Sequence, residues 1–169
     1  DYLENRDSLN TIAESFDSNA SILAFDIWHE TAKGKRIRRR PRGFDWYFRF
    51  KTGVFHQACF CRRALLNELN GFDTKYRITM DYDFFIRAKN SGARIELKST
   101  TFSVMRLIGI SSKVDWNSLK ARFKEEKVTH LSNATSTFER LGYTIYWLLY
   151  WPYRKCTYIL RTVRPTSTS

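Results

Sequence analysis

Two carboxylates stand near the centre of the chain, in the stretch GFDTKYRITMDYDFFIRA that runs from Gly71 to Ala88. Asp81 precedes a run with helical spacing of apolar residues, so it lies at the mouth of an expected helix. A carboxylate held there can take a proton from a substrate hydroxyl, which typically contributes about 10²–10⁴-fold to a reaction rate. The alternative is that Asp81 only caps the helix, because Asp is a preferred N-cap residue. The two roles are compatible, since capping one amide leaves a second carboxylate oxygen.

Four other polar side chains are candidates for binding a substrate next to Asp81. Asp83 and Arg87 are four residues apart, so they can also pair on one face of the helix, with Asp83 supporting its first turn. His56 and Gln57 can both donate and accept hydrogen bonds, as contacts to a polar substrate require. The alternative for His56 and Gln57 is a hydrogen-bonded pair at the end of a strand.

Helices and strands are both expected around these residues, which makes the predicted fold class α/β. Asn70-Gly71 supplies a left-handed stop for the helix in RRALLNELNGF, and Asp73 is expected to stabilise the turn that follows. The other expected helices run from Asp7 or Ser8 to about Phe16, from Asp81 to Asn90, and onward from Asp115 or Asn117.

Strands are predicted where β-branched and aromatic residues gather between turn signals. The run SILAFDIWH is one strand, and Arg36–Arg40 is expected to return beside it as an exposed edge strand. HQACFC reads as a short buried strand. Two further strands are expected at Arg94–Leu97 and Thr101–Leu107, separated by a polar turn.

The chain is strongly basic, with a formal net charge of +12, and seven of the ten residues from Lys33 to Arg42 are Lys or Arg. This balance favours a polyanionic partner. The basic run is either an anion-binding surface or a solvated hairpin. The neighbouring stretch Phe44–Phe55 mixes aromatic and basic residues, which can stack on nucleic-acid bases or form core with cations along it. A non-catalytic module that binds nucleic acid or an anionic membrane is therefore one hypothesis.

The three cysteines are an odd number, and Cys59 and Cys61 are too close in sequence for an ordinary disulfide. We therefore expect reduced thiols that pack in a cytosolic protein. Asp1–Asn10 is polar and acidic, which does not fit a signal peptide. His29 and His130 have no partners at metal-ligand spacing and are expected to be structural or surface residues.

The candidate residues fall within a pattern of four motifs in a fixed order. The chain resembles the inverting family 2 glycosyltransferases of the GT-A fold, in particular the bacterial surface-polysaccharide and colanic-acid-type enzymes. The motifs are His56-Gln57-Ala58-Cys59-Phe60, Gly71-Phe72-Asp73, Met80-Asp81-Tyr82-Asp83, and Ile108–Ser112 followed by a Lys-Glu helix. Met80 departs from the pattern, because many relatives have Glu at this position.

The resemblance implies a function and a site. Asp81 would be the catalytic base of a sugar transfer with inversion, in polysaccharide biosynthesis, from a nucleotide-diphospho-sugar to a saccharide or lipid-linked acceptor. Asp1 would be the last residue of a D-x-D-like motif that binds a divalent metal, Mg or Mn. The chain would then be the acceptor-side half of a GT-A domain, with mixed sheet and C-terminal helices, and inactive without its nucleotide-binding half. We expect the domain part to cover residues 1–113, a helical extension 114–165 and a disordered tail 166–169.

The segment LGYTIYWLLYWPYRKCTYILRTVR is apolar and aromatic from Tyr143 to Trp151, well short of the roughly 20 residues that span a bilayer. Pro152 is expected to kink or stop this helix. Cations follow it, namely Arg154, Lys155, Arg161 and Arg164. Tyr, Trp and cations favour the surface of an anionic membrane, which predicts a peripheral protein at the inner face of the cell membrane. The alternative is a helix packed on its own domain or on a second copy in a homo-oligomer.

Overall fold

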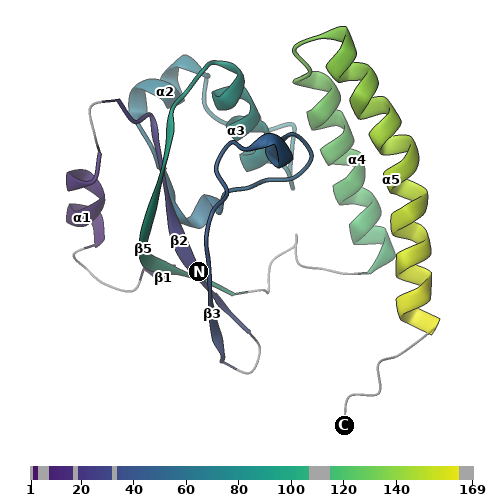
Figure 1. Cartoon of the computed structure of the whole chain (residues 1–169), viewed down its shortest axis with the longest axis horizontal. Coiled ribbons are helices and arrows are strands. Elements are labelled where there is room, and N and C mark those ends of the chain that lie inside the picture. Colours follow the sequence, from purple (N-terminus) through teal and green to yellow (C-terminus); the bar gives the residue numbers. More distant parts are fainter. Residues whose placement is uncertain (1, 4–7, 17–18, 32–33, 107–114, 164–169) are drawn as a thin grey trace. The chain divides into compact units, whose positions relative to one another are not determined.

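The computed structural model describes residues 2–3, 8–16, 19–31, 34–106 and 115–163, and it divides the chain into two compact units, 1–112 and 113–169 (Figure 1). Unit 1 combines a mixed sheet with helices, and unit 2 consists of C-terminal helices, so the predicted α/β class is confirmed. Asp1, the expected metal ligand, lies outside the described residues, as do Ile108–Ser112 and the expected tail.

The sheet of unit 1 is built around its central strand β2, Ile22–Glu30. One side of β2 pairs in parallel with β5, and the other side pairs antiparallel with β3 and with β4, at different positions along the strand. The short strand β1 closes the sheet beyond β5. The bounds of the partner strands are Tyr2–Leu3 (β1), Arg36–Arg39 (β3), Cys59–Cys61 (β4) and Ile95–Arg106 (β5).

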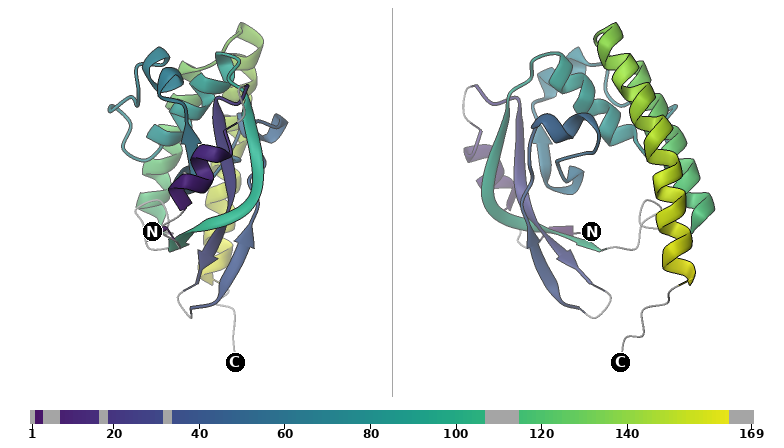
Figure 2. Two further views of the ribbon diagram at one scale, coloured as in Figure 1. Left: turned by 90° about the vertical axis from the view of Figure 1, so that its left-hand side faces the viewer. Right: turned by 45° about the vertical axis from the view of Figure 1, so that its right-hand side comes forward.

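Both faces of β2 are covered, which explains its nearly continuous apolar sequence. Ile22 and Ala24 face a core formed with the helices α2 and α3, whereas Leu23, Phe25 and Ile27 face a core that includes Ile12 of α1. Figures 1 and 2 show α1 on one side of the sheet and α2 and α3 on the other. The helices of unit 1 are α1 (Ser8–Glu14), α2 (Arg63–Glu68) and α3 (Met80–Asn90).

The two strands expected between residues 94 and 107 are one strand, β5. The predicted polar turn is an irregularity in its pairing with β2, because Phe25 pairs with Lys98 while Asp26 pairs with Thr101. Two extra residues of β5 are thus accommodated without ending the strand, as in a β-bulge. Arg38 donates a hydrogen bond to the carbonyl oxygen of Ser99 in this bulge.

Unit 2 is a pair of helices, α4 (Trp116–Ser132) and α5 (Thr137–Val163), that lie side by side in Figures 1 and 2. Asp115 caps α4 by accepting from the amides of Asn117 and Ser118 at 3.1 and 3.0 Å, as predicted. The expectation that Pro152 could stop the last helix is wrong, because α5 continues to Val163. It packs against α4 on both sides of the proline, which offsets the backbone hydrogen bond that proline removes.

Candidate active site

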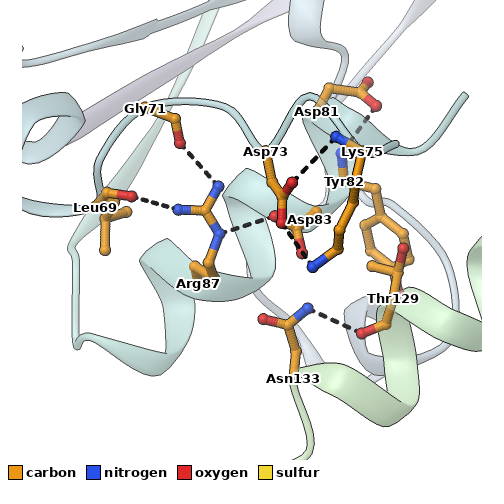
Figure 3. A network of polar contacts seen from close by, with 10 residues as sticks. All are labelled: Leu69, Gly71, Asp73, Lys75, Asp81, Tyr82, Asp83, Arg87, Thr129 and Asn133. Carbon is orange, nitrogen blue, oxygen red and sulfur yellow. Dashed lines mark hydrogen bonds and ion pairs between the residues drawn. The ribbon is translucent and has the colours of Figure 1, made fainter. Parts of the chain in front are cut away.

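The helix that carries Asp81 is fixed to the end of the preceding helix by Arg87, which also pairs with the buried Asp83 within its own helix. Arg87 donates from Nε to Asp83 at 2.8 Å, so the predicted pair on one helix face is confirmed. Its two other nitrogens donate to the carbonyl oxygens of Leu69 at 2.6 Å and Gly71 at 2.8 Å (Figure 3). Arg87 therefore ties α3 to the end of α2 through three acceptors at once. The substrate-binding role expected for Asp83 and Arg87 stays a prediction, and the structure gives both of them protein partners.

The turn between α2 and α3 has the backbone that its sequence predicts. Asn70 and Gly71 have φ angles of 56° and 68°, the left-handed conformation that Gly and Asn adopt most readily. Asp73 accepts a hydrogen bond from the amide of Lys75 at 3.1 Å and pairs with its ammonium group. These contacts lower the pKa of Asp73, the side-chain hydrogen bond from Lys75 most of all. The predicted role of Asp73 in stabilising this turn is confirmed.

Asp81 is the second residue of α3 and not its N-cap, which is Thr79. Its Oδ1 accepts from the amide of Tyr82 at 2.8 Å, so it does satisfy one amide of the first turn. The carboxylate turns away from the Asp83–Arg87 pair (Figure 3), as expected for residues two positions apart on a helix. Its side chain is 32 % exposed, whereas that of Asp83 is 4 % exposed. The two carboxylates are thus distinct: one is buried in a structural pair and one faces outward.

His56 meets Asp81 across 25 positions of sequence. The imidazole Nδ1 lies 2.9 Å from Oδ2 of Asp81, and the His56 side chain is more than half exposed. A hydrogen bond to a carboxylate requires the hydrogen on Nδ1, which leaves Nε2 as an acceptor in the neutral ring. Each of the two oxygens of Asp81 therefore accepts one hydrogen bond from the protein, Oδ1 from Tyr82 and Oδ2 from His56. Each carboxylate oxygen has a second lone pair, so the group can still accept a substrate hydroxyl.

The sheet places His56 at this position. His56, Gln57 and Ala58 form one turn of 3-10 helix, η2, directly before β4, whereas a strand was expected for all of HQACFC. The buried Ala58 anchors this turn, and Leu23 of β2 pairs with Phe60 of β4. Gln57 is half-buried beside His56. The sheet positions η2, and α3 positions Asp81. As a result, His56 and Asp81, two of the predicted site residues, lie in contact.

The aromatic stretch before η2 contributes core to the same region. Phe48 is fully buried, and its carbonyl oxygen accepts a hydrogen bond from the Tyr82 hydroxyl at 2.7 Å. Arg42 lies over the ring of Tyr47, with its guanidinium carbon 4.6 Å from the ring centre. Trp46, by contrast, is 71 % exposed. The burial of Phe48 fits the interpretation of this stretch as core, whereas the exposed Trp46 does not belong to that core.

The basic run contains the hairpin strand β3, and three of its arginines have acidic partners within the protein. Arg38 pairs with the buried Asp26 at 2.7 Å, and Arg40 lies 3.6 Å from the same carboxylate. Arg36 pairs with Glu30 at 3.3 Å. Asp26 was not anticipated from the sequence, although an Asp inside an apolar strand beside a basic strand is a signal for such a pair. The solvated-hairpin interpretation accounts for these arginines without a polyanion.

His29 and His130 take structural positions. His29 of β2 lies edge-on to the ring of Phe55, and burial together with the charge of Arg39 lowers its pKa. His130 of α4 is fully buried, stacks on Tyr143, and accepts a hydrogen bond at Nδ1 from Trp147 Nε1 at 3.0 Å. The expectation for both residues is confirmed.

A metal site is not formed by the described residues. In residues 2–3, 8–16, 19–31, 34–106 and 115–163, no three His, Cys, Asp or Glu side chains come together as ligands. The divalent metal therefore stays a prediction that depends on Asp1 and on groups elsewhere.

The three cysteines are free, and they differ in their surroundings. Burial raises the pKa of Cys59 to about 12 and also raises that of Cys61. Cys156 of α5 is exposed, so the expectation of packing thiols holds for two cysteines and is wrong for the third.

This difference predicts selective thiol labelling at pH 7.5. Since the thiolate is the reactive form, a maleimide should modify Cys156 at least about tenfold faster than Cys59 or Cys61. Peptide mass spectrometry after timed quenching measures the three rates. Equal rates at Cys59 and Cys156 would contradict the burial of the C-x-C pair.

No family model, curated protein or solved structure matches the chain.

Proposed function

We propose that the chain is the acceptor-side half of an inverting glycosyltransferase of the GT-A fold, with Asp81 as its catalytic base. The observation that carries the proposal is the state of this carboxylate. It is positioned by Tyr82 and His56, next to a buried ion pair that fixes its helix, and it is still open to solvent. An Asp with only a structural role would not need all of these features at once.

The proposed reaction is a single displacement at the anomeric carbon of a nucleotide-diphospho-sugar. The acceptor hydroxyl oxygen forms the new bond to this carbon while the bond to the diphosphate oxygen breaks. The diphosphate leaves with the electron pair of that bond. The hydroxyl proton passes to a free lone pair of Asp81, so a protonated carboxyl and a nucleoside diphosphate are formed with the glycoside.

Asp81 contributes to the reaction rate mainly through its position. A carboxylate is a weak base for a sugar hydroxyl, so the proton must move late, as the new bond forms. The increase in rate then comes from holding the acceptor oxygen and the base in a reactive orientation. The hydrogen bonds from Tyr82 and His56 fix the plane of the carboxylate. The three contacts of Arg87, to Asp83, Leu69 and Gly71, hold α3 in place, and we call them the Arg87 clamp.

The leaving diphosphate needs cationic stabilisation, which a divalent metal supplies in enzymes of this chemistry. We assign that task, and the binding of the nucleotide, to a half of the protein upstream of Asp1. Gln57 remains a candidate for contacts to the acceptor or the diphosphate. The acceptor would be a saccharide or a lipid-linked saccharide in polysaccharide biosynthesis, handled in the cytoplasm at the inner face of the membrane.

His56 is proposed as a positioning residue for Asp81. His56→Asn keeps a donor near the place of Nδ1, whereas His56→Gln keeps a polar group near the place of Nε2. If His56 acts through Asp81, His56→Gln should lower kcat by about ten- to a hundredfold, as expected for the loss of a hydrogen bond to a charged group, and His56→Asn should lower it less. The opposite order of the two variants would show that His56 instead contacts the substrate.

The proposal is tested by the release of nucleoside diphosphate from nucleotide-sugars by a chain that includes the half upstream of Asp1. Each common donor is supplied with a pool of bacterial lipid-linked and soluble saccharides, with and without Mg²⁺ or Mn²⁺. Acceptor-dependent release supports the function. Its absence with every donor, in a chain that binds nucleotide, would refute it.

A further inference from the structure

The last helix, α5, presents two faces of different character. One face packs on α4 through aromatic rings, where Phe123 lies between 5.6 and 6.2 Å from the ring centres of Trp147, Tyr150 and Trp151. Arg154 belongs to this face, since its guanidinium carbon lies 5.3 Å from the ring centre of Phe123. The packing of unit 2 thus uses the aromatic side of the helix and one of its cations.

The opposite face of α5 is exposed and apolar along most of the helix. We name it the apolar α5 face and define it by six aliphatic residues: Leu141, Ile145, Leu148, Leu149, Ile159 and Leu160. Phe138 extends it towards the start of the helix and Tyr153 lies within it, at 87 % and 61 % exposure. Cys156, also exposed, is on the same side at a spacing of seven from Leu149.

The size of this face excludes an incidental exposure of single side chains. A helix of 27 residues is about 40 Å long at 1.5 Å per residue. At about 100° per residue, the apolar α5 face covers an arc of about 120°, which is wider than the narrow seam of a coiled coil. Continuous apolar surface of this extent marks a site of contact with a protein or a membrane.

The charge balance of unit 2 favours an anionic surface. Residues 113–169 contain ten Lys and Arg against four Asp and Glu. Within α5 the one acidic residue, Glu139, is engaged with Thr135 and Tyr143. The exposed cations described on α4 and α5 are Lys120, Lys124, Lys127, Arg140 and Lys155. An apolar helix face accompanied by cations fits the headgroup and acyl boundary of an anionic bilayer.

The helix does not fit a transmembrane position. Among the helices of the described chain, none combines the length and the apolar character needed to cross a bilayer. A helix that is apolar on one face only is instead suited to lie in the plane of the interface.

We infer that the apolar α5 face inserts into the surface of an anionic lipid bilayer, with α5 parallel to the membrane plane. Leu148 and Leu149, near the middle of the face, enter the acyl boundary, and the lysines of unit 2 interact with lipid phosphates. This inference is independent of the proposed chemistry at Asp81.

The test is flotation of the full chain with vesicles of phosphatidylcholine alone or with a quarter phosphatidylglycerol. We expect binding to the anionic vesicles, weaker binding to the neutral ones, and a decrease with added salt. Leu148→Glu with Leu149→Glu should weaken the binding by at least about tenfold, because two large apolar side chains lose their burial. The control is Ala121→Glu with Val128→Glu, an equal charge change at exposed positions of α4. It should weaken the binding by less than about threefold.

A fluorophore attached to Cys156 reports the position of the face directly. Its emission should shift to the blue on anionic vesicles and should be quenched by lipids brominated in the acyl chain. Asp81→Asn should leave both signals unchanged, which separates this inference from the proposed function. Absence of vesicle binding by the wild-type chain, or equal binding by the α5 and α4 double variants, would overturn it. So would a dimer in light scattering that dissociates only in the α5 variant, because a second copy would then cover the face.

Discussion

Asp81→Asn is expected to reduce sugar transfer by about 10²–10⁴-fold in a chain that includes the nucleotide-binding half. The amide has nearly the shape of the carboxylate, and its oxygen can still accept the hydrogen bond from the amide of Tyr82. Its NH₂ group takes the place of the oxygen that faces His56, and it can donate to Nδ1 of the other imidazole tautomer. It cannot take the proton of the acceptor hydroxyl, so the loss falls on the chemical step. The measurement is kcat for nucleoside diphosphate release, with donor affinity and melting temperature determined in parallel.

The matched control for this variant is Asp73→Asn, the same chemical change eight residues earlier. Asp73 stabilises a turn and pairs with Lys75 at the surface, so the substitution should alter kcat by less than about twofold. A normal kcat in Asp81→Asn would remove Asp81 from the mechanism. An equal loss in both variants would show that the region is sensitive to structure and that Asp81 has no special part in proton transfer.

The second large effect concerns stability. Arg87→Ala should lower the free energy of unfolding by about 3–5 kcal/mol, because it removes the cationic partner of the buried Asp83 carboxylate. It also leaves the carbonyl oxygens of Leu69 and Gly71 without their donor. Arg87→Lys should be intermediate, since one ammonium group cannot reproduce the forked geometry of a guanidinium. Hydrogen exchange of the α3 amides in urea measures the change in this part of unit 1.

Two comparisons make the stability result specific to the clamp. Arg63→Ala removes an exposed arginine at the start of α2 and should change the free energy by less than about 0.5 kcal/mol. Replacing Asp83 and Arg87 together by Leu and Met should be less harmful than Arg87→Ala, since no buried charge remains. If Arg87→Ala and Arg63→Ala change the free energy of unfolding by the same amount, the Arg87 clamp does not hold α3 in place.

The local features of the site were predictable from the sequence because local chemistry determines them. Asn70 and Gly71 are residues that tolerate a left-handed backbone, so they predicted where α2 ends. The spacing of Asp83 and Arg87 predicted a pair on one helix face, which the structure confirms. Asp115 and Asn117 were the two predicted starts of α4, and the structure shows that Asp115 is the cap.

The tertiary features were not predictable in the same way. The contact between His56 and Asp81 depends on β4 pairing with β2 and on α3 packing against the sheet, and no local pattern encodes both. The bulge in β5 looked like a turn because Lys98–Thr100 is polar, but the pairing with β2 continues on both sides of it. Pro152 looked like a possible end of the helix, but the aromatic contacts with α4 extend past it.

Inversion at the anomeric carbon is the property that the proposed role of Asp81 requires. A single displacement assisted by one base turns over the configuration of the transferred sugar, whereas a route through a covalent glycosyl intermediate retains it. The decisive measurement is the NMR coupling of the anomeric proton in the first product formed from a donor of known configuration. The proposed mechanism predicts the configuration opposite to that of the donor. A product with retained configuration would contradict the assignment of Asp81 as the base of an inverting transfer.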